Sequence, residues 1–294
     1  MPGSFKKIGL VGRRQQDGLD VVLQELLELL GRRGHEVFLE DRLGELIPDT
    51  GLRLASRDEI GEASDLVIVA GGDGSMLSAA RTMAKYETPV LGVNRGRLGF
   101  LTDITPDQIA EQVPRVLDGD YDTENRFLLD AYVERNGEPM ARADALNDVV
   151  VNSGTSAQMI EIELSIDGKF VYRQRADGLI VSTPTGSTAY SLSGGGPIMH
   201  PSLDAIVLVP MFPHALSSRP IVVDGTSEIR VDILQRNRIH PPVTCDGQVN
   251  MTARPGDTVV IRKKPHRLTL LHPVGHSFYA SCRDKLRWSN ALVD

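Results

Sequence analysis

The sequence predicts an α/β domain followed by an all-β domain, because the pattern of apolar residues changes once along the chain. Up to about residue 122, short apolar runs alternate with longer helical patterns, which is typical of a Rossmann-like parallel sheet covered by helices. From about residue 123, short strand-like runs follow one another between turn residues, as in antiparallel β structure. A terminal helix at 278–288 is expected to return to the first domain. The expected domains are therefore 1–122 with about 273–294, and 123–272.

The elements of the first domain follow from its apolar runs. Strands are expected at 7–11, 36–39, 66–70 and 89–93, and helices at 19–30, at about 75–85 and from 105 onward. Thr105 and Pro106 suit the N-cap and first position of a helix, and Pro114 is expected to kink or end it. Ligands bind beyond the carboxyl ends of parallel strands, so we expect a site near 72–74 and 94–99.

The second domain is predicted from alternation and turn signals. Strands are expected at 127–134, 159–166, 169–175, 179–182, 206–209, 229–234, 258–262 and 268–271. Asn136-Gly137 and Asp167-Gly168 are hairpin turn signals. The segment 159–166 alternates apolar and polar residues, so one face should be buried and the other wet.

Composition limits the class of protein. The 294 residues are 41% apolar and 24% charged, which suits two globular domains with cores of their own. The net charge of −7 argues against a general nucleic-acid or membrane binder, and no apolar run approaches the ~20 residues of a membrane span. Cys245 and Cys282 predict no disulfide framework, so a cytoplasmic protein is expected.

The strand at 66–70 runs directly into the glycine turn Gly71-Gly72-Asp73-Gly74, which precedes a helical pattern. The free N–H groups of such a turn and the positive end of the helix dipole favour a phosphate. Asp73 is unusual there because its carboxylate repels phosphate. It is better explained as a proton acceptor or as the ligand of a metal ion that bridges to phosphate. Asp also often precedes Gly in ordinary turns, which is the alternative explanation.

A second glycine-rich loop contains Gly92, Gly96 and Gly99 together with Arg95 and Arg97. One interpretation is a second wall of a nucleotide site, with arginine available for the phosphate charge. The other is a connector with solvated arginines. The sequence of the loop alone favours neither.

Polar clusters interrupt the β domain. Asn147-Asp148 stands before an apolar run, and as an isolated pair it is more typical of a polar strand start. The segment 182–193 carries seven Ser or Thr hydroxyls and Tyr190, which suits hydrogen bonds to a sugar or amide and stacking on a base better than a flexible linker. Asp246-Gly247 is explained as a hairpin turn. The histidines lack the spacing of a zinc site.

Taken together, these motifs resemble the NAD kinases, in the family's order and over most of the chain. The resemblance implies a phosphotransferase with an alcohol acceptor, which moves the γ-phosphoryl group of ATP to the 2′-hydroxyl of the adenosine ribose of NAD and makes NADP. It also implies an α/β and a β domain with a site in the cleft between them, and a homodimer or homotetramer. A divalent cation, Mg²⁺, would screen Asp73 from the triphosphate.

The resemblance also assigns roles to matching positions. Asp73 matches the general base on the 2′-hydroxyl, and Gly74 lines the nucleotide beside it. Asn147 and Asp148 match a pair that holds the adenosine part of NAD. Further NAD-binding positions that the resemblance implies are Gln158, Arg175, Asp177, Thr188, Ala189, Tyr190, Ser191, Leu192, Ser193 and Gln248. No metal ligand can be assigned from the sequence.

Two other functions compete with this interpretation. The Gly-Gly-Asp-Gly turn also occurs in diacylglycerol, sphingosine and phosphofructokinase-like kinases, but the Asn147-Asp148 pair and the segment 188–193 speak against a lipid or sugar kinase. A non-catalytic sensor that binds NAD or NADH is the second alternative. The intact Asp73 disfavours it, because a sensor needs no proton acceptor.

Overall fold

The computed structural model describes residues 5–13, 18–48, 51–96, 99–154 and 158–288. The chain divides into two compact units, residues 1–125 with 266–294 (unit 1) and residues 126–265 (unit 2). The strands β6 (Tyr121–Arg135) and β17 (Thr258–Pro273) carry the chain from one unit to the other. The boundaries of the compact units thus fall at 125 and 265, inside these strands, where the sequence suggests 122 and 272.

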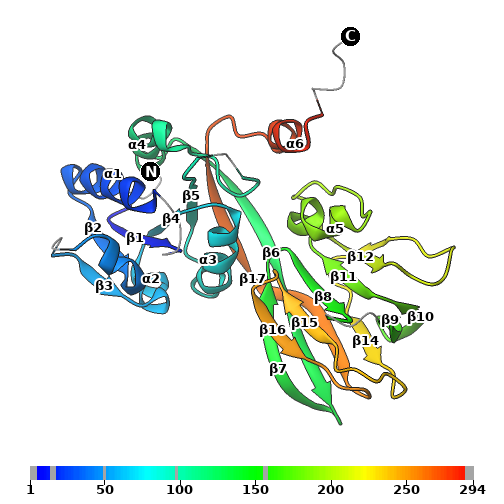
Figure 1. The fold of residues 1–294 in the computed structure, drawn as a ribbon. Coiled ribbons are helices and arrows are strands. Elements are labelled where there is room, and N and C mark those ends of the chain that lie inside the picture. The colour runs from blue at the N-terminus through cyan, green and yellow to red at the C-terminus, as the bar shows by residue number, and fades with distance from the viewer. Residues whose placement is uncertain (1–4, 14–17, 49–50, 97–98, 155–157, 289–294) are drawn as a thin grey trace. The chain divides into compact units, whose positions relative to one another are not determined.

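Unit 1 contains a parallel sheet in the order β3-β2-β1-β4-β5 (Figure 1). Its strands are β1 (Lys7–Gly12), β2 (Glu36–Glu40), β3 (Arg53–Ala55), β4 (Leu66–Ala70) and β5 (Val90–Val93). The end of β17 adds to this sheet beside β5, with Leu270 paired to Val90 in parallel. The strands that follow β1 lie on both sides of it, as in the Rossmann order. Such a sheet changes direction between β1 and β4, and ligands bind beyond the carboxyl ends of the strands at that point.

Helices cover both faces of this sheet. The covering helices are α1 (Leu19–Arg32), α2 (Arg57–Ala63), α3 (Asp73–Tyr86) and α4 (Ile109–Leu117). Unit 1 also contains the helix α6 (Phe278–Leu286) and the short 3₁₀ turns η1 (Asp41–Leu46) and η2 (Pro106–Gln108). Helices α1 and α4 lie on one face, where their apolar side chains share a core with Ile8 and Leu66 (Figure 1). Helices α2 and α3 lie on the other face. A Cβ on Gly9 would come within 2.3 Å of the Ile60 side chain, so α2 packs directly on β1 there.

The predicted strands of unit 1 and its first helix are confirmed, whereas β3 and α2 were not predicted because both are short. Pro114 was expected to kink or end its helix, and the second of these is wrong, since α4 continues through Pro114 to Leu117. A proline in a helix leaves the carbonyl four residues earlier without its N–H partner. That carbonyl belongs to Ala110, which is exposed, so water can satisfy it.

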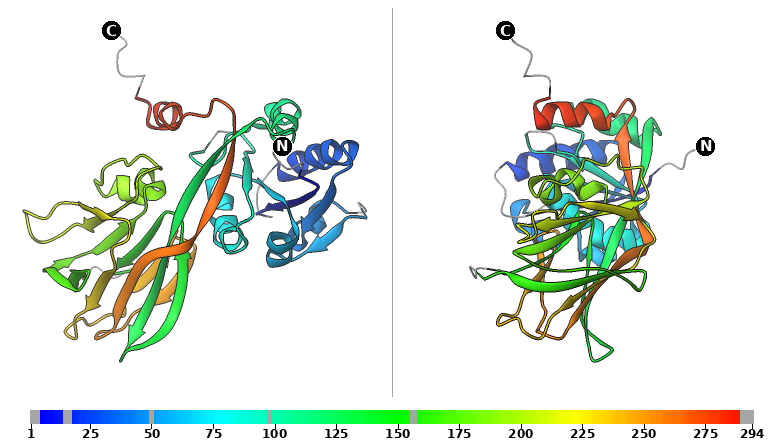
Figure 2. Two further views of the ribbon diagram at one scale, coloured as in Figure 1. Left: turned by 180° about the vertical axis from the view of Figure 1, so that it is seen from behind. Right: turned by 90° about the vertical axis from the view of Figure 1, so that its right-hand side faces the viewer.

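Unit 2 consists of two antiparallel sheets. The six-stranded sheet has the order β13-β12-β11-β8-β15-β16, and the second sheet joins β10, β9, β14 and β17 with β6 and β7. Their bounds are β7 (Glu138–Ala145), β8 (Asp148–Asn152), β9 (Ile160–Ile166), β10 (Lys169–Ala176), β11 (Gly178–Ser182), β12 (Ala205–Met211), β13 (Ile221–Asp224), β14 (Ile229–Ile233), β15 (Pro242–Cys245) and β16 (Val249–Thr252). Apolar residues of both sheets form one core, so the sheets pack face to face (Figure 2).

The alternation predicted for 159–166 is confirmed, because Ile160, Ile162 and Leu164 of β9 are buried between polar neighbours. The prediction of separate strands at 258–262 and 268–271 is wrong, since β17 is one continuous strand. The charged stretch between them stays in the strand because its cations are paired. Lys263 Nζ donates to the Asp204 carboxylate at 2.6 Å, and Lys264 pairs with Asp144.

Two further segments bear on the site. After β11, a 3₁₀ turn η3 (Thr185–Thr188) and the short helix α5 (Tyr190–Ser193) cover the outer face of the six-stranded sheet. The predicted terminal helix is confirmed as α6, which belongs to unit 1. In the part of the chain that the structure describes, no helix is long and apolar enough to cross a membrane.

Candidate active site

The glycine turn of unit 1 joins β4 to α3. Gly71 has φ +147°, a conformation that side chains other than glycine rarely adopt, and its N–H donates to the carbonyl of Val93 at 2.8 Å. Gly72 is the N-cap of α3, and Asp73 is the first residue of the helix. The sequence therefore places a carboxylate at the positive end of a helix dipole, on the carboxyl edge of the parallel sheet.

The carboxylate of Asp73 is held by the second glycine-rich loop. Its Oδ2 accepts the N–H of Phe100 at 3.0 Å, and its Oδ1 accepts the N–H of Leu101 at 3.1 Å. Gly99 lies so close that a Cβ there would come within 1.8 Å of Oδ1. Each carboxylate oxygen can accept a further hydrogen bond, so Asp73 is oriented yet still able to accept a proton.

Both loops line one cavity of about 460 Å³ in unit 1. Its lining includes Asp73, Asn94 and Arg95, and also Lys285 from the last turn of α6. Arg97, the other arginine predicted for this wall, lies outside the described residues. Lys285 was missed by the sequence analysis, because a lysine near the end of a terminal helix carries no signal of its own. Two cations and one carboxylate around a glycine turn suit a phosphate group and a proton acceptor.

In unit 2, the backbone around Asn147 and Asp148 is fixed by a side chain from the hairpin between β15 and β16. The carboxylate of Asp246 accepts N–H groups from Leu146 at 3.1 Å and from Asn147 at 2.7 Å. The N–H of Asp246 in turn donates to the carbonyl of Asp148 at 2.9 Å. Asp246 was explained from the sequence as a turn residue only, and its contact lies 100 residues away in the chain.

The last residue of β11 and the segment after it hold the same pair from the other side. Thr183 N donates to the carbonyl of Asn147 at 2.9 Å, and Ser182 Oγ donates to it at 3.0 Å. A Cβ on Gly186 would lie 2.2 Å from that carbonyl oxygen, so only glycine fits there. The structure thus brings Asn147, Asp148, the residues after β11 and the hairpin that carries Gln248 together. They lie at one edge of the six-stranded sheet, where β8 begins and where β11 and β15 end.

Asp148 is a buried carboxyl group at this edge, with only 4% of its surface exposed. Burial, and to a smaller extent the charge of Asp246, raise the pKa of Asp148 to about 7. Ionised Asp148 therefore destabilises the folded unit. The pKa of this carboxyl is higher in the folded state than its value of 3.8 in the unfolded state. The free energy of unfolding therefore falls as pH rises from about 4 to about 7, and the loss stays constant at higher pH.

Asp148→Asn should for that reason stabilise the protein in a pH-dependent manner. We expect the gain in unfolding free energy to grow by about 2–4 kcal/mol between pH 4.5 and pH 8.5. Urea unfolding at several pH values measures it, and Asp118→Asn, which removes an exposed carboxylate, is the matched control. A gain that is the same at both ends of the pH range would contradict the assigned cause.

The predicted segment 188–193 forms the end of η3 and helix α5. Ser191 is buried, whereas the ring of Tyr190 is 45% exposed. A Cβ on Gly194 would meet Val209 at 2.9 Å, so the turn after α5 packs tightly against the sheet. The helix is therefore anchored while Tyr190 and Ser193 face outward, free to contact a ligand.

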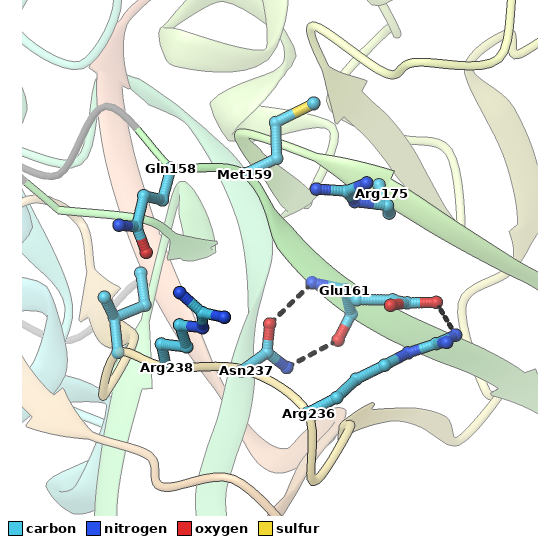
Figure 3. A pocket seen from close by; sticks show the side chains of 8 residues that line it. Gln158, Met159, Glu161, Arg175, Arg236, Asn237 and Arg238 are labelled. Carbon is cyan, nitrogen blue, oxygen red and sulfur yellow. Dashed lines mark hydrogen bonds and ion pairs between the residues drawn. The ribbon is translucent and has the colours of Figure 1, made fainter.

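Three predicted residues lie elsewhere. Ser182, the last residue of β11, pairs with Asp148, whereas Asp177 stands just before the first residue of β11. Asp177 and Asp148 are therefore separated by the length of this strand, about 17 Å. Arg175 and Gln158 line a cavity of about 810 Å³ in unit 2, which also contains Arg236 and Arg238 (Figure 3). Within one chain, the proposed NAD-binding residues of unit 2 thus form two groups at opposite ends of β11.

The structure allows a test of where Mg²⁺ could bind. Mg²⁺ is held by one or two carboxylates together with substrate phosphates, and Asp73 supplies a carboxylate in the cavity of unit 1, so this cavity fits. Asp103, His272 and His276 also bring possible ligand atoms within 4.8 Å of one another. Two imidazoles and one carboxylate are not the oxygen-rich set that Mg²⁺ prefers. Both Nδ1 atoms instead lie against the Asp103 carboxylate as ion pairs.

A carboxylate in a glycine turn at the carboxyl edge of a Rossmann-ordered sheet, beside two cations, is the arrangement that a nucleotide-dependent phosphotransferase needs. Residues 8–121 match the family model "ATP-NAD kinase N-terminal domain", and residues 146–272 match "ATP-NAD kinase C-terminal domain". The chain therefore belongs to the NAD kinase family.

Individual relatives agree with this assignment. The NAD kinase of Marinobacter nauticus is 57% identical over 289 residues, which cover 98% of each chain. An Archaeoglobus fulgidus NAD kinase solved in complex with ATP matches with a TM-score of 0.72 and 26% identity, over 96% of this chain and 98% of that one. A yeast NADH kinase complexed with NADH matches in fold with a TM-score of 0.90 and 23% identity, over all of this chain and 91% of that one.

Proposed function

We infer that this chain transfers the γ-phosphoryl group of ATP to the 2′-hydroxyl of the adenosine ribose of NAD and so makes NADP. The observation that carries the inference is the carboxylate of Asp73. It lies in a glycine turn at the start of a helix, which favours phosphate, and two backbone N–H groups orient it without using up its capacity to accept a proton.

Asp73 acts as the general base in this mechanism. The 2′-hydroxyl oxygen attacks the γ-phosphorus in line with the bond to the leaving oxygen of ADP, and the hydroxyl proton passes to the Asp73 carboxylate. Phosphoryl transfer depends on positioning and charge neutralisation more than on covalent chemistry. Arg95 and Lys285 line the same cavity and supply positive charge for the triphosphate. Mg²⁺ at Asp73 would neutralise phosphate charge and keep it from repelling the carboxylate.

The proposed NAD contacts of unit 2 begin at the edge that carries Asn147 and Asp148. The backbone of this pair is held on both sides, so its side chains are preorganised to position the adenosine. Gln248 and the segment 188–193 lie at the same edge and are proposed to contact the same dinucleotide. Gly74 lies beside Asp73 in the first turn of α3, where it lines the nucleotide.

The second group of proposed NAD contacts supports an oligomer. Asp177 lies about 17 Å from Asp148 along β11, and Arg175 and Gln158 line a cavity of their own. A second copy of the chain can supply this group to a site that the first copy leaves incomplete, which supports the proposal of a homodimer or homotetramer. A cytoplasmic location is also proposed, because neither Cys245 nor Cys282 is part of a disulfide, as is usual in a reducing compartment.

Tyr190→Ala should raise the KM for NAD by about 5- to 100-fold and leave the KM for ATP within about twofold, because the ring is proposed to stack on the dinucleotide. Initial rates at varied NAD and varied ATP measure both constants. Tyr279→Ala removes another exposed tyrosine, on α6, and should change neither constant. Equal increases for both substrates in Tyr190→Ala would count against this placement of Tyr190.

The activity is tested with labelled ATP, Mg²⁺ and a set of acceptors: NAD, a diacylglycerol, sphingosine and fructose 6-phosphate. We expect label to enter NAD and none of the others. Transfer to a lipid or sugar in preference to NAD would identify a different kinase of the same fold. Binding of NAD without any transfer from ATP would identify a dinucleotide sensor.

A further inference from the structure

The segment that orients Asp73 is itself short and needs an anchor. Residues 99–103 form the last part of the second glycine-rich loop and lead into Ile104, whose carbonyl accepts the N–H of Asn94 at 2.7 Å. Within the segment, the Thr102 hydroxyl accepts hydrogen bonds from Asn94 Nδ2 at 2.9 Å and from Gly99 N at 3.1 Å. These contacts close the loop on itself, and the bridge between Ile104 and Val93 ties its end to β5.

Asp103 provides a second anchor through its side chain. One of its carboxylate oxygens pairs with His272 Nδ1, and the other lies 2.9 Å from His276 Nδ1. The two imidazole rings stack with their centroids 4.1 Å apart and their planes at 15°. On the far side of His272, Nε2 lies 3.2 Å from the carboxylate of Glu124. His272 thus stands between two carboxylates from two different parts of the chain.

His272 is well suited to hold a loop in place because its own position is rigid. Its side chain is only 2% exposed, and it lies on β17 directly after Leu270 and Leu271, which pair with β5 in the parallel sheet. The strand next to β5 on its other side is β4, which ends at the Asp73 turn. His272 and Asp73 therefore belong to elements of the same sheet.

We propose that His272 is a positioning residue for phosphoryl transfer: it holds Asp103, and thereby sets the 99–103 segment whose N–H groups orient the Asp73 carboxylate. The proposal rests on the proposed function, in which Asp73 is the base. The contacts run from His272 to Asp103 by an ion pair, and from Phe100 and Leu101 to Asp73 by hydrogen bonds of 3.0 and 3.1 Å. A base displaced by a fraction of an ångström loses rate in the chemical step, whereas substrate binding by other residues is unaffected.

Four variants of the full chain test the proposal. Two are the single substitutions His272→Gln and Asp103→Asn, and the other two combine each of them with Asp73→Asn. With Asp73 intact, we expect either substitution to lower kcat by about tenfold, with both KM values within about twofold. In the Asp73→Asn background, the same substitution should lower the residual kcat by less than about twofold, because the group it positions is gone. His266→Gln, an exposed histidine on the same strand, is the control and should leave kcat unchanged.

The outcomes separate a positioning role from a structural one. A substitution that only loosens the fold lowers kcat by the same factor in both backgrounds, and that result would overturn the proposal, as would an unchanged kcat. If His272→Gln does not fold, as judged by its thermal melt, Asp103→Asn tests the same contact from the other side. Absence of NADP formation by the wild-type chain would refute the proposed function itself. Near-normal turnover by Asp73→Asn alone would show that Asp73 is not the base, and this inference would then also be refuted.

Discussion

Asp73→Asn should lower kcat by about 10²–10⁴-fold while the protein stays folded and binds NAD with nearly unchanged affinity. The amide cannot take the proton of the 2′-hydroxyl, so the step loses its base. The structure adds a second cost, because both carboxylate oxygens accept backbone N–H groups, from Phe100 and Leu101. An asparagine presents its NH₂ group to one of these donors, which leaves one N–H without an acceptor.

Rapid-mix measurement of NADP formation gives the turnover, and titration with NAD gives the affinity. Asp58→Asn is a matched control in the same unit, since Asp58 is an exposed carboxylate that pairs with Lys85 at 3.2 Å. Its turnover should be within about twofold of the wild type. A turnover of Asp73→Asn within threefold of the wild type would mean that another group takes the proton.

The second large effect concerns the acceptor. An NAD analogue that lacks the 2′-hydroxyl of the adenosine ribose should bind and yet receive no phosphate, because the attacking oxygen is missing. NADP should likewise accept none, since that oxygen is already esterified and its phosphate brings negative charge toward Asp73. We expect NADP to act as a product or an inhibitor.

The matched control is NAD that lacks the 2′-hydroxyl of the nicotinamide ribose. It should still accept phosphate, since Asn147 and Asp148 are proposed to place the adenosine end at Asp73. Phosphate transfer from labelled ATP to each compound measures the acceptor. Transfer to the adenosine 2′-deoxy compound at a rate near that of NAD would require the roles of these residues to be reassigned.

Much of the fold could be predicted from local patterns. The buried run of β4 and the alternation of β9 each report the burial of a strand directly, and both predictions are confirmed. The errors arise where contacts between distant residues override the local signal. β17 continues through the charged residues Lys263 and Lys264 because Asp204 and Asp144 neutralise them, and neither pairing is visible along the chain.

The candidate site, too, has a part that local patterns predict and a part that depends on contacts between distant residues. The Asp73 turn has a signal of its own in the sequence, whereas the Asn147-Asp148 pair was assigned to the site only by the resemblance to the family. The groups that hold them have no signal of their own: Asp246, Gly186 and His272 act across long stretches of chain, and each has an ordinary local explanation. The position of Asp177 at the far end of β11 from Asp148 could not be predicted either, because it depends on the register between β8 and β11.

The most direct test of the proposed reaction is the position of the transferred phosphate. The wild-type chain is incubated with NAD, γ-labelled ATP and Mg²⁺, and the dinucleotide product is isolated and examined by phosphorus NMR and with an NADP-specific dehydrogenase. We predict one labelled phosphate per product molecule, esterified to the 2′-oxygen of the adenosine ribose and accepted by the dehydrogenase. A product with the label on any other oxygen, or a dinucleotide that carries no label, would contradict the assigned reaction.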